Sequence, residues 1–230
     1  MIVGENNMNK NLFLKAIIRY ILGVVLVGIL LFVPAGTLKF WNAWLFMGIL
    51  FIPMFIAGII LMFKNPMLLK SRLDVKEQEQ EQKYVILYSG LMFLFGFIIA
   101  GLNYRFSWIK IPNNIVIISS IIFLISYILY AEVLRENTYL SRTIKVQNNQ
   151  KVVDTGFYGI VRHPMYTITI ILFLTIPLML GSIISFIIFL IYPFIISKRI
   201  SNEEKVLEKE LIGYIEYKKK VKYKLIPFIW

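Results

Sequence analysis

The most prominent pattern in the sequence is a series of long apolar runs separated by short polar or charged segments. Four of these runs, at residues 17–33, 43–63, 84–102 and 115–131, have about the length needed to cross a hydrocarbon core of roughly 30 Å. Tryptophan and tyrosine residues lie near their ends, as in the aromatic belts of membrane proteins. The pattern therefore predicts four membrane-spanning helices in the first part of the chain.

A fifth apolar stretch, residues 165–197, is too long for one ordinary span, and Gly181-Ser182 in its middle is typical of a tight turn. Each arm then has about 15 residues and a length of about 22–24 Å, and Pro177 and Pro193 are expected to kink the arms. We expect a short helical hairpin that crosses where the bilayer thins or where neighbouring helices cover its ends. The predicted fold is an all-α polytopic membrane helix bundle of about six spans, the last two forming this hairpin.

Composition agrees with a membrane protein. Hydrophobic residues make up 58% and charged residues 17% of the 230 residues, whereas a soluble domain has about half and about a quarter. The mean hydropathy is +0.72, so this apolar excess has to be solvated by lipid. The chain contains no cysteine, which excludes disulfides, thiolate metal ligands and cysteine nucleophiles. No metal site is predicted.

The distribution of basic residues predicts the orientation. With six crossings, 22 of the 25 Lys and Arg residues lie on one side, and only Lys39, Arg105 and Lys110 lie on the other. Because basic residues gather on the cytoplasmic side, both termini are predicted to be cytoplasmic, in the cell membrane of a bacterium. The net charge of +12 is then explained without nucleic acid as a partner.

The chain is predicted to have two parts: a four-span membrane region at 1–136, and a C-terminal core with the hairpin and a cytoplasmic tail at 137–230. The low-complexity run Glu77-Gln78-Glu79-Gln80-Glu81-Gln82 is predicted to be a solvated helical loop without a function.

Ion pumps and proton relays usually carry ionisable residues in the middle of their membrane spans. The apolar cores of this chain carry no Asp, Glu, Lys or His well inside them. Candidate chemistry is therefore expected at the membrane surface. Two polar clusters flank the hairpin, at 156–166 and 198–204. A tight hairpin returns its far end beside its start, so His163 and Tyr166 are expected near Arg199 and Glu203. The alternatives are that His163 is an interfacial anchor and that Arg199 and Glu203 form a plain pair four residues apart on a helix.

The order and spacing of these clusters resemble the isoprenylcysteine carboxyl methyltransferase family, including its bacterial members, over residues 137–230. The matching motifs are Asn137-x-x-x-Ser141-Arg142, Gln150-Lys151-Val152-Val153, Gly156-x-Tyr158, Val161-Arg162-His163-Pro164-x-Tyr166, Arg199-x-x-x-Glu203-Glu204, Gly213-Tyr214-x-x-Tyr217 and Val221. The first four spans match the family only in general character.

This resemblance implies methyl transfer from S-adenosyl-L-methionine to a small or lipid-borne acceptor at the cytoplasmic membrane surface. It places Arg199 at the methyl acceptor, as the catalytic residue. The residues that it assigns to the cofactor pocket are Val152, Val153, Tyr158, His163, Pro164, Met165, Tyr166 and Glu203. No Gly-x-Gly-x-x-Gly fingerprint of a soluble nucleotide-binding fold is present.

Two other functions stay open at this point. One is an NADPH-dependent membrane reductase with a core like that of sterol reductases, although such a site should carry more basic residues for the extra phosphate. The other is a non-enzymatic membrane scaffold, in which the clusters are interface anchors. Membrane lipid is an expected partner in every case, while the identity of the acceptor and the oligomeric state are left open by the sequence.

Overall fold

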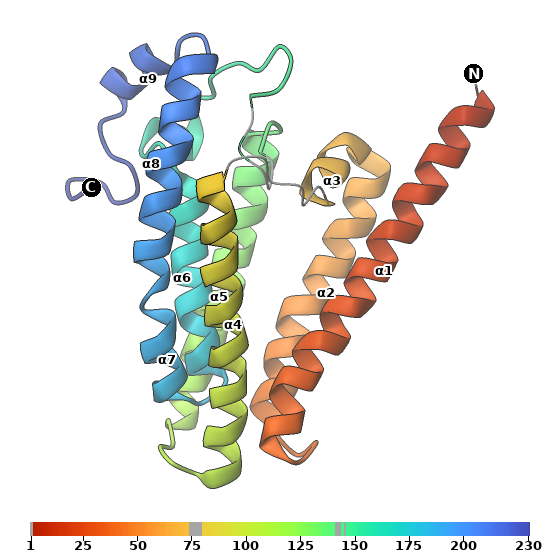
Figure 1. The fold of residues 1–230 in the computed structure, drawn as a ribbon, viewed down its shortest axis with the longest axis vertical. Helices are drawn as coiled ribbons and strands as arrows, with labels where there is room; N and C mark the ends of the chain where they lie inside the picture. Colours follow the sequence, from red (N-terminus) through yellow and green to blue (C-terminus); the bar gives the residue numbers. More distant parts are fainter. Residues whose placement is uncertain (1, 74–79, 141–143, 145) are drawn as a thin grey trace.

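The computed structural model describes residues 2–73, 80–140, 144 and 146–230, and within them the chain forms helices and connecting segments without a strand (Figure 1). In chain order the helices are α1 (Ile2–Ala35), α2 (Trp41–Lys64), α3 (Pro66–Leu73), α4 (Gln80–Phe106), α5 (Asn113–Glu136), the 3-10 turn η1 (Gly156–Gly159), α6 (Pro164–Met179), α7 (Ile183–Phe189), α8 (Tyr192–Glu210) and α9 (Tyr214–Lys220).

The predicted all-α membrane bundle is confirmed. Five helical stretches in the described part of the chain are long and apolar enough to cross a membrane: Leu12–Ala35, Trp41–Lys64, Gln82–Phe106, Asn113–Glu136 and Ile183–Glu210. A further apolar helix, α6, has 16 residues and a length of about 24 Å. About six spans therefore account for the bundle.

The predicted hairpin turn is present between α6 and α7. Gly181 has φ +73°, a left-handed conformation that favours glycine, and the Ser182 side chain accepts a hydrogen bond from the Ser185 backbone N–H at 3.2 Å, which caps α7. The second arm is interrupted between α7 and α8. Pro193 lies in the first turn of α8 and has no N–H to donate to a carbonyl in the preceding turn. The kink expected at Pro193 thus falls at a break in the helix, whereas Pro177 lies within α6 and does not end it.

Three connections meet at one end of the bundle. The amide of Asn42 donates to the carbonyl of Met179 at 3.0 Å, and the amide of Asn103 donates to that of Gly181 at 3.2 Å. The Tyr104 hydroxyl donates to the Lys39 carbonyl at 3.1 Å. The α1–α2 loop, the end of α4 and the hairpin turn thus lie together, as a six-span topology requires.

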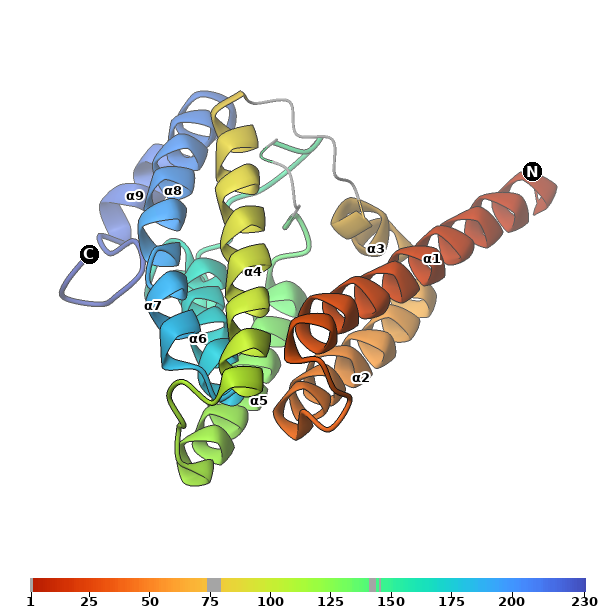
Figure 2. The same cartoon turned by 60° about the horizontal axis from the view of Figure 1, so that its bottom comes forward.

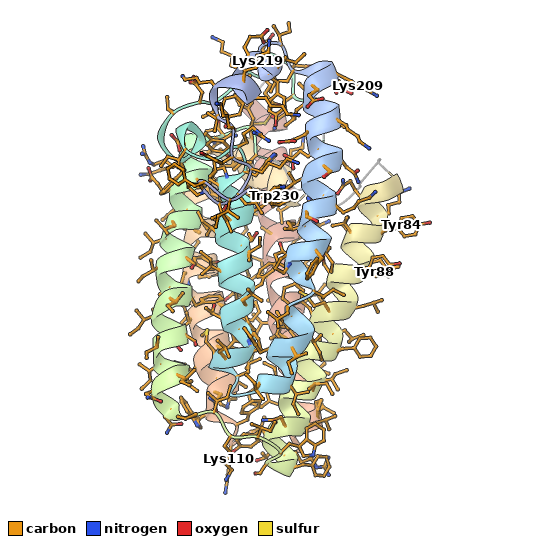
Figure 3. The ribbon with its side chains drawn as sticks, turned by 90° about the vertical axis from the view of Figure 1, so that its left-hand side faces the viewer. Tyr84, Tyr88, Lys110, Lys209, Lys219 and Trp230 are labelled. Atoms are coloured by element: carbon orange, nitrogen blue, oxygen red, sulfur yellow. The ribbon has the colours of Figure 1, made fainter. Side chains whose placement is uncertain are left out.

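The opposite end carries α9 and is called the α9 end below. Lys209 and Lys219 lie at the α9 end, and Lys110 lies at the other end (Figure 3). These lysines, which the sequence assigned to opposite sides of the membrane, therefore lie at opposite ends of the long axis of the molecule. That the α9 end faces the cytoplasm stays a prediction.

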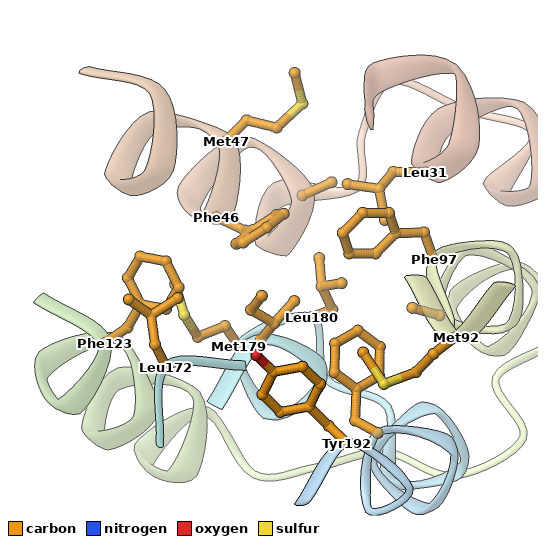
Figure 4. Packing of buried hydrophobic residues seen from close by; sticks show 14 of the residues in the cluster. Leu31, Phe46, Met47, Met92, Phe97, Phe123, Leu172, Met179, Leu180 and Tyr192 are labelled. Carbon is orange, nitrogen blue, oxygen red and sulfur yellow. The ribbon is translucent and has the colours of Figure 1, made fainter. Parts of the chain in front are cut away.

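The hairpin is held in the bundle by one apolar core to which both parts of the chain contribute (Figure 4). Phe46 of α2 and Phe97 of α4 pack there with Met179 of α6 and Phe189 of α7. The Ser185 hydroxyl also donates to the Gly96 carbonyl of α4 at 2.8 Å. The division at residue 136 stays a prediction, since the shared core neither requires nor excludes it.

Two features were not predicted. The short helix α3 forms at 66–73, where a cytoplasmic connection was expected, and it packs against α1 and α2 (Figure 2). The Glu/Gln run falls partly outside the described residues, at 77–79, but Gln80 begins α4 and Gln82 is fully buried. The prediction of a solvated loop is therefore wrong for Gln82.

A close approach of α1 and α4 provides a test of the packing. A Cβ atom on Gly101 would lie 2.6 Å from the Leu31 carbonyl oxygen and 3.1 Å from the Ala35 nitrogen, both of which are backbone atoms. We expect Gly101→Ala to lower the free energy of unfolding by about 1–3 kcal/mol, because the helices must separate. Gly90→Ala, on the same helix and with no described atom within 4 Å of its Cβ, should be neutral or stabilising by up to about 1 kcal/mol. Thermal unfolding of the detergent-solubilised variants measures both, and equal shifts would contradict the packing.

Candidate functional site

A cavity at the α9 end lies between the start of α6, the facing side of α8, α9 and the segment 137–153. Apolar side chains, among them Val152 and Val153, line it together with polar groups such as Arg199 and Glu203, a combination typical of small-molecule sites. The hairpin explains its position, because the tight turn at Gly181 brings α8 back beside the start of α6 (Figure 1).

The local sequence prepares the start of α6. His163 occupies the N-cap position, and Pro164 follows within the first turn of the helix, where a missing N–H costs no intrahelical bond. Tyr166, two residues further on, is therefore fixed on the first turn of α6. Its side chain, like that of His163, is buried, with 5% of the surface of each residue exposed.

A buried ion pair beside the cavity joins the guanidinium of Arg162 to the carboxylate of Glu204. Arg162 Nε donates to Glu204 Oε1 at 2.7 Å, and His163 Nε2 lies 3.2 Å from the same oxygen. The side chains of Arg162 and Glu204 are only 4% and 6% exposed. Lys224 Nζ and Lys218 Nζ lie 3.6 and 3.8 Å from Glu204 Oε2. The negative charge of the buried Glu204 carboxylate is thus surrounded by three cationic side chains and the imidazole.

The guanidinium of Arg162 also fixes the C-terminal segment. Its Nη1 atom donates to the carbonyls of Val221 at 2.8 Å and Lys222 at 2.7 Å. The backbone N–H groups of Arg162 and His163 donate to the carbonyls of Tyr223 and Lys224, both at 2.9 Å. The segment after α9 therefore lies along the chain just before α6 and closes that side of the site.

A tyrosine hydroxyl links the two residues that the sequence paired across the hairpin. The Tyr166 hydroxyl donates to Glu203 Oε2 at 2.5 Å and accepts from Arg199 Nε at 2.9 Å. The expected proximity of Tyr166, Arg199 and Glu203 is thus found. The alternative from the sequence was a simple Arg199–Glu203 pair on one helix. It does not describe these contacts, because the Tyr166 phenol lies between the guanidinium and the carboxylate.

Gln82 is a site residue that sequence reasoning missed. Its Oε1 atom accepts a hydrogen bond from Arg199 Nη1 at 3.3 Å, and both side chains are buried. Gln82 belongs to α4, far from the motifs in sequence, and lies in a run of Glu and Gln that has no distinguishing local pattern. Only the packing of α4 against α8 brings it to Arg199.

Three tyrosines form a further wall of the cavity. Tyr217 donates its hydroxyl to the Tyr158 carbonyl at 2.8 Å, and burial raises the pKa of Tyr158, Tyr214 and Tyr217 well above the usual value near 10. These hydroxyls therefore stay protonated at physiological pH. The Tyr214 hydroxyl is buried without a hydrogen-bond partner among the described residues, which costs free energy unless a ligand supplies the partner.

The structure places eight of the nine predicted site residues on the cavity wall: Val152, Val153, Tyr158, His163, Met165, Tyr166, Arg199 and Glu203. Pro164 is the exception, because it is buried at the start of α6 and does not line the cavity. Ser141 and Arg142 of the upstream motif lie outside the described residues. The roles assigned to the lining residues stay predictions.

Fold and site together define a class: a polytopic helical membrane protein with a cavity of mixed polar and apolar lining at one end of its bundle. Residues 116–209 match the profile of the Isoprenylcysteine carboxyl methyltransferase (ICMT) family. This region begins within α5 and ends within α8. It confirms the resemblance over residues 137–209, and it supports a membrane methyltransferase. The motifs after residue 209 lie beyond the match and stay predictions. A comparison with curated proteins found no match.

The buried ion pair provides a test of the site's architecture. We expect Glu204→Ala to lower the free energy of unfolding by about 3–5 kcal/mol, because it leaves the Arg162 charge buried without its partner. Glu208→Ala, on the same helix, removes only a half-exposed pair with Lys218 and should cost at most about 1 kcal/mol. Thermal unfolding of both purified variants is the measurement. A Glu204 variant as stable as the Glu208 variant would contradict the assignment.

Proposed function

We propose that this protein is a membrane methyltransferase that uses S-adenosyl-L-methionine and acts on a small or lipid-borne acceptor at the cytoplasmic membrane surface. The observation that carries the proposal is the cavity itself. It gathers the carboxylate of Glu203, the guanidinium of Arg199 and the tyrosine wall, and most of its polar side chains come from the region that matches the methyltransferase family.

The lining residues fit the chemical groups of this cofactor, which supplies an electrophilic methyl group when bound. Glu203 is partly exposed to the cavity and would bind the ammonium group. The ring of Tyr166 would face the sulfonium, since aromatic faces attract cations. Val152, Val153 and Met165 supply an apolar surface for the adenine. The Tyr214 hydroxyl, buried and without a partner among the described residues, supplies one more polar contact to the ligand.

Arg199 is the residue proposed to hold the methyl acceptor. Tyr166 and Gln82 fix its guanidinium from two sides, so its orientation is set before a substrate arrives. A planar guanidinium binds a carboxylate or phosphate through two parallel hydrogen bonds. Methyl transfer is an in-line displacement, and holding the nucleophile in line is a large part of its catalysis.

The same contacts argue against the reductase. A reductase that uses NADPH needs basic side chains for the extra phosphate, and Arg162 was one of the few basic residues available in the sequence. Its guanidinium is instead bonded to Glu204 and to two carbonyls of the C-terminal segment.

Isothermal titration calorimetry of the detergent-purified protein separates the three functions. S-adenosylhomocysteine should bind and NADPH should not. Glu203→Gln should weaken the binding of S-adenosylhomocysteine by about 10-fold or more, because a charge-assisted hydrogen bond is lost. Glu208→Gln is the matched control on the exposed side of α8. Binding of NADPH alone would support the reductase, and binding of neither ligand would support the scaffold.

The Tyr214 hydroxyl gives a narrower prediction. Tyr214→Phe should weaken the affinity for S-adenosylhomocysteine by about 2- to 12-fold, the effect of one neutral hydrogen bond, without lowering the thermal midpoint. Tyr88→Phe, on the exposed face of α4, is the control and should change neither quantity. An unchanged affinity in the Tyr214 variant would show that its hydroxyl does not contact the ligand.

Arg199 is tested by separating binding from turnover. Arg199→Lys should keep the affinity for S-adenosylhomocysteine but lower the transfer of labelled methyl groups to total membrane and small-molecule extracts by about 10- to 100-fold, because the acceptor is no longer aligned. Arg135→Lys, at an exposed surface pair with Glu132, serves as the control. Full turnover in the Arg199 variant would overturn this role.

A further inference from the structure

A second cavity, called the α1–α2 groove here, lies between α1, α2 and α3 and shares no residue with the site described above. Figure 2 shows these three helices set beside the rest of the bundle. The empty volume of the groove is about 1,070 Å³. Most of its wall is apolar, with Ile17 and Tyr20 from α1 and Met54, Gly58 and Met62 from α2.

Two arginines interrupt this apolar wall. Arg19 of α1 donates through Nη1 to the Leu73 carbonyl at the end of α3, and Arg72 of α3 donates through Nη2 to the Tyr130 hydroxyl. The Arg72 guanidinium also lies over the Tyr130 ring, 5.7 Å from its centroid. These contacts fix both side chains at the groove, and each recorded bond uses only one of the five N–H donors of a guanidinium.

Two positive charges therefore lie at the groove. Among the residues that the structure describes, its lining contains Arg19 and Arg72 and no Asp or Glu. Arg19 lies within the apolar stretch Leu12–Ala35, and an ionisable residue in a membrane span usually pairs with an opposite charge or marks a binding site. An anion beside the two guanidinium groups would supply an opposite charge.

The dimensions and surroundings of the groove favour a lipid over a water-soluble anion. Its α2 residues extend from Met54 to Phe63, which corresponds to about 14 Å of helix and to about half of a hydrocarbon core of roughly 30 Å. Phe13, Phe55 and Phe63 on the groove are 49%, 45% and 82% exposed. The groove thus opens onto the lipid-facing surface and has the depth of one leaflet.

We propose that the α1–α2 groove binds one anionic phospholipid of the bilayer. The phosphate lies between Arg19 and Arg72, and an acyl chain lies against Ile17, Met54 and Gly58. Basic pockets between membrane helices bind anionic headgroups in this way. This site is independent of the proposed methyl transfer, because none of its residues lines the cavity at the α9 end.

The groove is nevertheless linked to the wall of the other cavity through one side chain. Tyr130, which accepts the Arg72 hydrogen bond, packs against the buried cluster of Val133, Tyr158 and Ile168. A bound lipid that holds Arg72 would therefore also hold α3 against α5.

Native mass spectrometry of the detergent-purified full chain tests the proposal, with phosphatidylglycerol and phosphatidylcholine of identical acyl chains as probes. Phosphatidylglycerol should form a one-to-one complex with the protein, and phosphatidylcholine should form much less of this complex at the same concentration. The double variant Arg19→Gln/Arg72→Gln should bind it at least about 10-fold more weakly, since two charge-assisted contacts are lost.

Gly58→Leu keeps the charge but fills the groove, because a Cβ at Gly58 meets no described atom within 4 Å. It should also weaken binding of phosphatidylglycerol about 10-fold or more, through loss of the acyl-chain contacts. Gly48→Leu is the matched control on the same helix, with equally open surroundings and a position outside the groove. It should bind like the unchanged protein.

Three outcomes would overturn the proposal: equal binding of the two phospholipids, unchanged binding in Gly58→Leu, or binding of free palmitate with neither phospholipid. An unchanged thermal midpoint of the groove variants shows that they fold. Because this control does not use S-adenosylhomocysteine, a failure of lipid binding is distinguished from a failure of the proposed methyltransferase function.

Discussion

The carboxylate of Glu204 is buried with the guanidinium of Arg162, and three segments of the chain meet at this contact. Arg162 lies just before α6, Glu204 lies on α8, and the C-terminal segment lies against both, since its carbonyls accept from Arg162. Removing two charges from water is costly unless their remaining hydrogen-bonding atoms are satisfied. Here His163 contacts the carboxylate and two carbonyls accept from the guanidinium. The end of the hairpin is therefore closed in one arrangement.

Because Glu204 is held in this ion pair, the adjacent Glu203 has a different environment. Successive residues on a helix differ by about 100° in direction, so Glu204 points toward Arg162 while Glu203 faces the cavity. Glu203 meets the Tyr166 hydroxyl, which in turn meets Arg199 one turn earlier on α8. A structural ion pair thus supports the row of polar groups to which ligand binding is assigned.

The prediction of the fold from the sequence succeeded where the signal was local. Apolar runs long enough to cross a bilayer predicted the spans, and the Gly181-Ser182 turn predicted the hairpin and with it the meeting of Tyr166 with Arg199. The helix α3 was missed, because its eight residues are too few to show a helical period and lie between two spans. The assignment of a solvated loop failed at Gln82, whose environment is set by α8 rather than by its neighbours in sequence.

The sequence by itself determined the class of fold and the short hairpin, because hydrophobic length and turn chemistry act between nearby residues. The residues expected at the cavity came from the pairing across this hairpin and from the resemblance of the motifs to the methyltransferase family. Only the tertiary structure decided which of these residues form the structural ion pair and which face the cavity. In it Glu204 is bonded to Arg162, Glu203 faces the cavity, and Gln82 lies against Arg199. His163 lines the cavity and also lies against Glu204. The physical reason is that each carboxylate has two oxygens and many possible partners, and only packing selects among them.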